Sequence, residues 1–88
     1  PKLWLLESPV AREARFLYQL PRGIDRAELR LYTVTGRLVW RTELSSGGGE
    51  VSWPLLTTGG NRVASGLYLA VIVTPQGNSA ILQVVVQR

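Results

Sequence analysis

The sequence predicts an all-β fold, an antiparallel sandwich in which residues 1–88 form a single domain, on three observations. Hydrophobic residues make up 45% of the 88 residues and charged residues 18%, which suffices for one small core. Apolar side chains recur at every second position along most of the chain, as they do in half-buried strands. Turn-forming residues interrupt this alternation at short intervals, and no segment carries a helical stripe.

Seven strands are expected between the turns, at residues 3–6, 14–20, 26–33, 37–44, 50–56, 66–74 and 79–87. The second, third, fifth and seventh strands have alternating apolar side chains, at Phe16, Tyr18 and Leu20, at Leu29 and Leu31, at Val51, Trp53 and Leu55, and at Leu82, Val84 and Val86. About seven short strands in a domain of this size are typical of an immunoglobulin-like or fibronectin-III-like sandwich. A small barrel is the alternative.

Three segments indicate where individual strands lie in the sheets. The run from Leu67 to Val73 is apolar on both faces, which predicts a central strand covered on both sides. Pro54 has no amide proton, so its strand is expected at an edge or with a bulge. Charges in segments 15–19 and 26–30 are expected to protect exposed edges from pairing with other chains.

The turn between the third and fourth strands admits two registers. A two-residue turn places Trp40 in the core. A three-residue loop with Gly36 in the left-handed conformation pairs Thr33 with Arg37, and it turns Val39 inward and Trp40 outward. The choice moves every side chain of the fourth strand to the other face, because side chains alternate with a period of two. The alternation of Leu38, Trp40, Thr42 and Leu44 favours the register that buries this row. We favour the three-residue loop with a partly exposed Trp40, since Gly36 stands at its end.

Missing residue types limit the chemistry that this chain can perform. Cys, His and Met are absent. Their absence excludes disulfides, Cys or His metal sites and Cys or His nucleophile–base pairs, and it removes the commonest general base. The six acidic residues form no D-x-D and no E-x-x-E motif. We therefore expect no catalytic residues, no cofactor and no metal site in a protein that is not an enzyme.

The charge is basic but dispersed. The net charge is +4 with an isoelectric point near 10.4, and nine of the ten basic residues are Arg. These arginines stand mostly alone between apolar residues, which suits solvated strand positions better than a nucleic-acid-binding stripe. The longest apolar run is far shorter than the roughly 20 residues of a membrane-spanning helix. We expect neither a nucleic-acid partner nor a membrane span.

The aromatic residues divide into core candidates and one surface candidate. We expect the core to be filled by aromatic side chains, because these dominate burial in small domains, at Trp4, Phe16, Tyr18, Trp53 and Tyr68. The Tyr68 hydroxyl is also a candidate for a tyrosine corner, in which it bonds to nearby backbone. The candidate interaction patch on the outer strand face consists of Arg30, Tyr32, Leu38 and Trp40.

Several motifs resemble, in their order and spacing, one group of bacterial Ig-like domains. Residues 15–21 (RFLYQLP) form an opening strand, and residues 29–39 (LRLYTVTGRLV) form a hairpin. Trp53 then precedes residues 60–68 (GNRVASGLY), and residues 84–88 (VVVQR) end the chain in an apolar strand with a basic residue. This pattern resembles the Ig-like domain of flagellar hook-capping proteins and the related C-terminal sorting domains of the type IX secretion system.

The sequence departs from that pattern at three places. Thr33 replaces the usual Asp of the hairpin turn, residues 54–57 replace an Asp-Gly-x-Asp/Asn segment, and Ser8-Pro9 replaces Asn-Pro. The departures put in doubt a polar or cation-binding loop after Trp53. They do not affect the prediction of a sandwich.

The resemblance implies a non-catalytic C-terminal module of a larger exported protein, located outside the cell or at its surface. The last strands carry the sorting signal in that family, so the candidate sorting segment comprises Gly66, Leu67, Tyr68, Val84, Val85, Val86 and Arg88. The partners expected are proteins, namely secretion machinery, domains of the parent protein or like subunits. Two alternatives remain, a structural or self-assembling Ig-like spacer of a surface or flagellar structure, and an accessory module that binds glycans or peptides.

Overall fold

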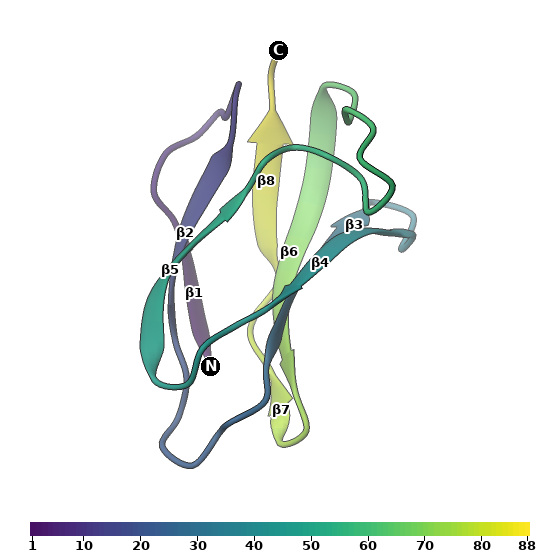
Figure 1. Ribbon diagram of the computed structural model, residues 1–88. Coiled ribbons are helices and arrows are strands. Elements are labelled where there is room, and N and C mark those ends of the chain that lie inside the picture. The colour runs from purple at the N-terminus through teal and green to yellow at the C-terminus, as the bar shows by residue number, and fades with distance from the viewer.

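Two antiparallel sheets face each other in the computed structural model, which describes all 88 residues (Figure 1). The eight strands are β1 (Lys2–Leu5), β2 (Ala14–Gln19), β3 (Glu28–Thr33), β4 (Leu38–Glu43), β5 (Gly48–Trp53), β6 (Gly66–Thr74), β7 (Gly77–Asn78) and β8 (Leu82–Val86). One sheet has the order β1-β2-β5. The other has the order β4-β3-β6, and both β7 and β8 pair with β6.

This arrangement confirms the predicted all-β sandwich, with one strand more than expected. The additional strand, β7, lies before the expected strand at residues 79–87, which is shortened to β8. Between β7 and β8, the contact with β6 is made by Ser79. Its amide donates to the Ile72 carbonyl at 2.9 Å, and its hydroxyl oxygen accepts the Ile72 amide at 2.8 Å. The β8 ladder on β6 therefore begins only at Leu82.

The core lies between the sheets and follows the alternation of the sequence. Side chains of this core are fully or almost fully buried, and they include Phe16, Tyr18, Leu29, Leu31, Trp53, Leu55, Tyr68, Ile72, Val84 and Val86. Strands β2, β3 and β8 contribute every second residue, because successive side chains of a strand point to opposite faces. Removal of this apolar surface from water is the main favourable term in the folding of the domain.

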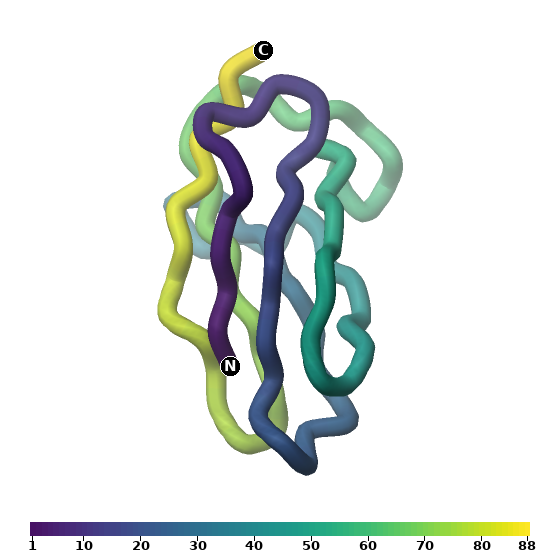
Figure 2. Tube along the Cα trace, turned by 90° about the vertical axis from the view of Figure 1, so that its left-hand side faces the viewer, coloured from purple at the N-terminus to yellow at the C-terminus, as the bar shows by residue number.

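One lateral side of the sandwich is closed by the segment after β1. The Val10 amide donates to the Val85 carbonyl at 2.9 Å, and the Gln87 amide donates to the Val10 carbonyl at 2.8 Å. The bridge between Val10 and Val86 is parallel, so the chain leaves the first sheet after β1 and joins the second beside β8. Figure 2 shows this N-terminal segment next to the yellow C-terminal strand. β5 is an edge strand of the first sheet, and β4 is an edge strand of the second.

The expected positions of strands are confirmed in part. β5 is an edge strand and ends at Trp53, immediately before Pro54, as the missing amide proton of proline requires. The prediction that segments 15–19 and 26–30 lie at edges is wrong, because β2 and β3 are each paired on both sides. β6 is central as expected, but its outward Leu67 is 38% exposed, so no second layer covers that end.

The β3–β4 turn has the three-residue loop, followed by a bulge. The Thr33 amide donates to the Arg37 carbonyl at 2.9 Å, and Gly36 has a φ of 91°. The register then shifts, because Leu31 pairs with Trp40 and leaves Val39 without a partner of its own. Val39 is buried, and Trp40 is half-buried against the core. The prediction that Trp40 points outward is therefore wrong, since the extra residue turns its ring inward.

Candidate functional site

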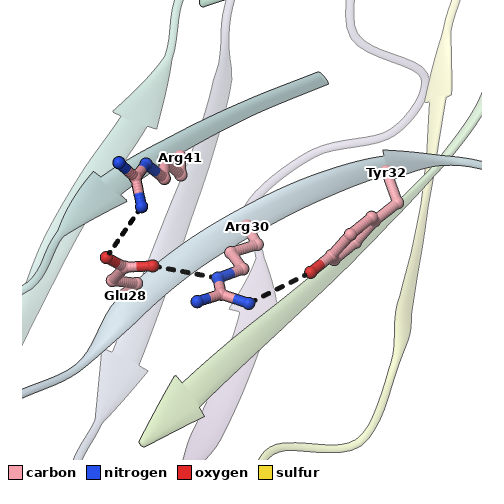
Figure 3. Close-up of polar contacts among 4 residues, drawn as sticks. All are labelled: Glu28, Arg30, Tyr32 and Arg41. Carbon is pink, nitrogen blue, oxygen red and sulfur yellow. Dashed lines mark hydrogen bonds and ion pairs between the residues drawn. The ribbon is translucent and has the colours of Figure 1, made fainter. Parts of the chain in front are cut away.

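The outer face of β3 carries a linked set of charged and polar side chains. Glu28, Arg30 and Tyr32 are alternate residues of this strand, so they project to the same side (Figure 3). Arg30 Nε donates to Glu28 Oε1 at 2.9 Å, and Arg30 Nη1 donates to Tyr32 Oη at 3.4 Å. Arg41 Nη1 lies 3.6 Å from Glu28 Oε2. One carboxylate therefore holds two guanidinium groups from adjacent strands.

These contacts fix the charge and the orientation of Arg30. The hydrogen bond to Tyr32 and then the one to Glu28 raise the pKa of Arg30 above its ordinary value, against a smaller effect of burial that lowers it. Arg30 is thus a permanent cation at every physiological pH. The cluster can present an oriented guanidinium to a partner. Because Arg30 keeps its protons at physiological pH, it does not act in general acid–base catalysis.

The structure brings together three of the four residues of the candidate interaction patch. Arg30 and Tyr32 share the outer face of β3, and Leu38 of β4 pairs with Tyr32 across the ladder. Trp40 lies on the opposite face, with its ring centroid 6.5 Å from that of the buried Trp53. The aromatic ring expected to anchor the patch is therefore part of the interior packing.

The residues of the candidate sorting segment lie side by side. In the ladder between β6 and β8, Gly66 pairs with Val86, Leu67 with Val85 and Tyr68 with Val84. The side chains of this ladder alternate between the core and the outer surface.

Only part of that segment faces solvent. Tyr68, Val84 and Val86 are buried, whereas Leu67 is 38% and Val85 42% exposed. Leu67 and Val85 are direct cross-strand partners, so they form a small apolar pair on the outer face. Any partner that meets the folded segment therefore meets Leu67 and Val85 before it meets the buried valines.

Arg88 fastens the end of the chain to the loops at one end of the sandwich. Its amide donates to Ser65 Oγ at 3.0 Å, and its Nη2 donates to the Leu55 carbonyl at 2.9 Å. Leu55 is fully buried and has a φ of 61°, an uncommon backbone conformation for a residue with a side chain. Arg88 thus gives a second donor to the Leu55 carbonyl, which also accepts the Val63 amide at 3.0 Å.

Tyr68 forms the predicted tyrosine corner. Its hydroxyl donates to the Ala64 carbonyl at 2.7 Å, and its ring packs edge-on against Trp53 with centroids 5.4 Å apart. Trp53 Nε1 donates to the Leu56 carbonyl at 2.9 Å. The buried polar atoms of both rings therefore have partners, and the rings tie β5 and β6 to the long loop between these strands.

The chain resembles known proteins in structure but not detectably in sequence families. No protein-family model and no curated protein matches the chain. The domain does have neighbours among solved structures. Dimeric latent PorU from Porphyromonas gingivalis matches 96% of this chain with 25% identity and a TM-score of 0.82, over 9% of the PorU chain. The likeness thus concerns about a tenth of that larger protein.

A second solved neighbour is PorZ, described as an essential bacterial surface component of the type-IX secretion system of Porphyromonas gingivalis. The match covers 98% of this chain and 11% of PorZ, with 26% identity and a TM-score of 0.69. The likeness to PorU and PorZ fits the resemblance of the motifs to type IX domains, and it supports a secretion-related role.

Two surface features were not expected from the sequence. Trp4 was expected in the core, but it is 46% exposed and pairs with the exposed Leu17 of β2. Its neighbours Leu3 and Leu5 pack against the core instead, and an unbroken apolar run gives no sign of which residues face inward. The second feature is a groove lined by Arg37 and Arg62, two residues that lie far apart in the sequence.

The structure also limits what the domain can hold. No group of three or more Asp and Glu side chains is arranged to hold a metal ion. No helix is long and apolar enough to cross a membrane. The side chains of the candidate residues supply guanidinium, phenol and aliphatic groups.

Proposed function

We propose that this domain is a non-catalytic module by which type IX secretion machinery recognises a larger exported protein and directs it to the cell surface or beyond. The observation that carries the proposal is the likeness to PorU over nearly the whole chain. The motif order from residue 15 to residue 88 supports it independently. A fold alone does not establish a function, so the proposal depends on the two together.

The surface proposed for recognition is the outer side of the paired segments 66–68 and 84–88. Leu67 and Val85 are its exposed apolar side chains, and Arg88 follows at the chain end. The partners are proteins of the secretion machinery, neighbouring domains of the parent protein or like subunits. The proposal assigns no catalysis, no cofactor and no metal to the domain, in keeping with the absence of His and Cys.

An export assay tests the proposal directly. Residues 1–88 are fused to the C-terminus of a periplasm-targeted reporter in a bacterium that has a type IX system, and in the same strain without it. We expect reporter outside the cell only in the first strain. Periplasmic reporter in both strains, with the fused domain folded, contradicts the proposal.

A matched pair of double variants locates the recognised surface. Leu67→Ser with Val85→Ser changes an exposed cross-strand pair on one sheet, and Trp4→Ser with Leu17→Ser changes an equivalent pair on the other. We expect export to fall for the first and to persist for the second. Equal export by both variants argues against recognition through Leu67 and Val85.

A second candidate function, a structural unit that associates by strand addition, is favoured by the edge of β5. The Leu20 amide donates to the Gly47 carbonyl, and hydrogen-bonded pairs alternate along an antiparallel ladder. The backbone groups of Gly48, Glu50 and Ser52 therefore point away from β2, at an edge that no strand covers. Sedimentation at high protein concentration tests this candidate, and a monomer throughout contradicts it.

A further inference from the structure

A groove opens at one end of the sandwich, between the β3–β4 turn and the loop that precedes β6. It has a volume of about 290 Å³. Figure 1 shows the turn and the loop near each other at the right of the molecule. Arg37 of the turn and Arg62 of the loop contribute to its lining, together with the apolar Val39, Val63 and Tyr68. Thus the lining of the groove combines two arginines with apolar residues.

The walls of the groove are held in place by hydrogen bonds to backbone carbonyls. The Thr58 amide and hydroxyl donate to the Val39 carbonyl at 2.9 and 3.2 Å, which fastens the loop to the bulge in β4. The Tyr68 hydroxyl holds the far side of the loop through Ala64. Because both sides are already fixed, a ligand loses little free energy in ordering them.

The positive charge of the groove has no counterpart within the domain. Both ion pairs of the structure use Glu28, so neither Arg37 nor Arg62 has a carboxylate within 4.0 Å. Thr33 lines the groove beside Arg37, but its uncharged hydroxyl accepts the Arg37 amide at 3.1 Å. No acidic residue contributes to the lining.

A second basic depression shows the contrast. The surface around Arg12 and Arg15 also contains Glu7 and Glu13, which balance the two arginines. The dispersed arginines of this domain are therefore not equivalent, and the pair at the groove is the one whose lining holds apolar residues and no acid.

We propose that this groove binds an acidic peptide segment of a partner protein. A carboxylate of the peptide lies between Arg37 and Arg62, because guanidinium groups form strong, charge-assisted hydrogen bonds with carboxylates. A neighbouring apolar side chain covers Val39, Val63 and Tyr68. Two isolated cations and a buried tyrosine do not make the basic track and exposed aromatic platform that bind single-stranded nucleic acid.

The first experiment compares two peptides on the 88-residue domain. Acetyl-Leu-Glu-Val-amide and acetyl-Leu-Gln-Val-amide are titrated into ¹⁵N-labelled protein, and the backbone amide shifts are followed by NMR. We expect saturable shifts around Val39, Ala64 and the two arginines for the glutamate peptide alone. Equal shifts for both peptides, shifts centred elsewhere or no shifts overturn the proposal.

The second experiment uses charge-matched variants. Arg37→Gln with Arg62→Gln removes the two groove cations, and Arg12→Gln with Arg15→Gln removes two cations from the balanced depression. Loss of charge-assisted hydrogen bonds predicts at least about tenfold weaker binding of the glutamate peptide to the first variant. We expect the second variant to bind the glutamate peptide as the unchanged domain does. An equal loss of affinity in both variants overturns the proposal.

Inorganic phosphate is the last probe. Saturable shifts at the same amides with phosphate, as strong as those with the peptide, mark a general anion site and overturn the assignment of a peptide. This proposal does not depend on the secretion-related function, because binding is measured on the isolated domain. A failed export assay and a failed titration are therefore separate results.

Discussion

The Tyr68 hydroxyl joins the start of β6 to the loop before it. This side chain is buried, and its hydrogen bond to the Ala64 carbonyl is 2.7 Å long. This bond is partly buried, so water replaces it only in part when the donor is removed. The Tyr68 hydroxyl therefore contributes to the stability of the long loop, and the ring of Tyr68 contributes to the core.

We expect Tyr68→Phe to lower the free energy of unfolding by about 1 kcal/mol, the usual net contribution of one intramolecular hydrogen bond. Tyr32→Phe is the control, since its hydroxyl accepts a longer bond from Arg30 on the outer face. We expect the control to change stability by less than about 0.5 kcal/mol. Urea denaturation followed by Trp fluorescence measures both, and equal losses contradict the assignment of the corner.

The two tryptophans at positions 40 and 4 allow a second test at the residue scale. Trp40→Ala leaves a gap beside Trp53, and we expect a loss of about 2–3 kcal/mol, less than for a fully buried aromatic ring. Trp4→Ala removes an exposed ring, and we expect a loss below about 1 kcal/mol. Thermal unfolding followed by circular dichroism compares them. If Trp4→Ala lowers the stability more than Trp40→Ala does, the assignment of Trp40 to the interior is contradicted.

Among the elements, the β3–β4 hairpin decides which side chains reach the surface. Its loop ends at Gly36, and the bulge after Leu38 adds one residue to β4. The loop sets the pairing of Tyr32 with Leu38, and the bulge then turns Trp40 toward Trp53. A single inserted position thus separates the arginine and tyrosine of the candidate patch from its tryptophan.

Gly36→Ala tests the turn. The residue has a φ of 91°, where a side chain is strained, so we expect a loss of about 1–2 kcal/mol in unfolding free energy. Gly59→Ala is the control, because a Cβ there makes only ordinary contacts and needs no left-handed backbone. Equilibrium urea unfolding distinguishes them. Equal stability of the two variants contradicts a strained turn at Gly36.

Across the whole molecule, the two sheets depend on strands from both ends of the chain. Val10 and β8 close one side, and Val84 and Val86 of β8 belong to the buried core between the sheets. The last strand is therefore part of the fold and not a free tail. A surface proposed for recognition at this strand exists only while the sandwich is intact.

Deletion of residues 84–88 tests this dependence on the last strand. The truncated chain loses two buried valines, the bridge to Val10 and the anchor formed by Arg88, so we expect no cooperative thermal unfolding. Leu67→Ser with Val85→Ser serves as the folded reference, because both side chains are partly exposed. A truncated domain that still melts cooperatively shows that β8 is dispensable.

The sequence was sufficient for the strands and for much of the core. Period-two alternation identified Phe16, Leu31 and Val84 as inward, and Gly36 identified the loop. It was not sufficient where a run is apolar throughout, as around Trp4, because alternation is then invisible. It also gave no sign of the bulge at Val39, which arises from the pairing of strands.

In the candidate sites too, the sequence predicted local patterns but not the contacts between distant residues. The pairing of residues 66–68 with residues 84–86 follows from two strands that the sequence predicted, although their register does not. Arg30 and Tyr32 lie together because they are two apart on one strand, which a local pattern fixes. Trp40 lies apart from Arg30 and Tyr32, because the bulge at Val39 turns its ring toward the distant Trp53.

Composition and strand period are local properties of the chain, so they were enough to predict the fold class and the absence of Cys and His chemistry, and they left Tyr68 as a candidate for the tyrosine corner. The fold in three dimensions sets which edges are open, which way Trp4 and Trp40 face, and that Arg37 and Arg62 line one groove. These features depend on contacts between residues far apart in the chain, and no periodicity encodes such contacts.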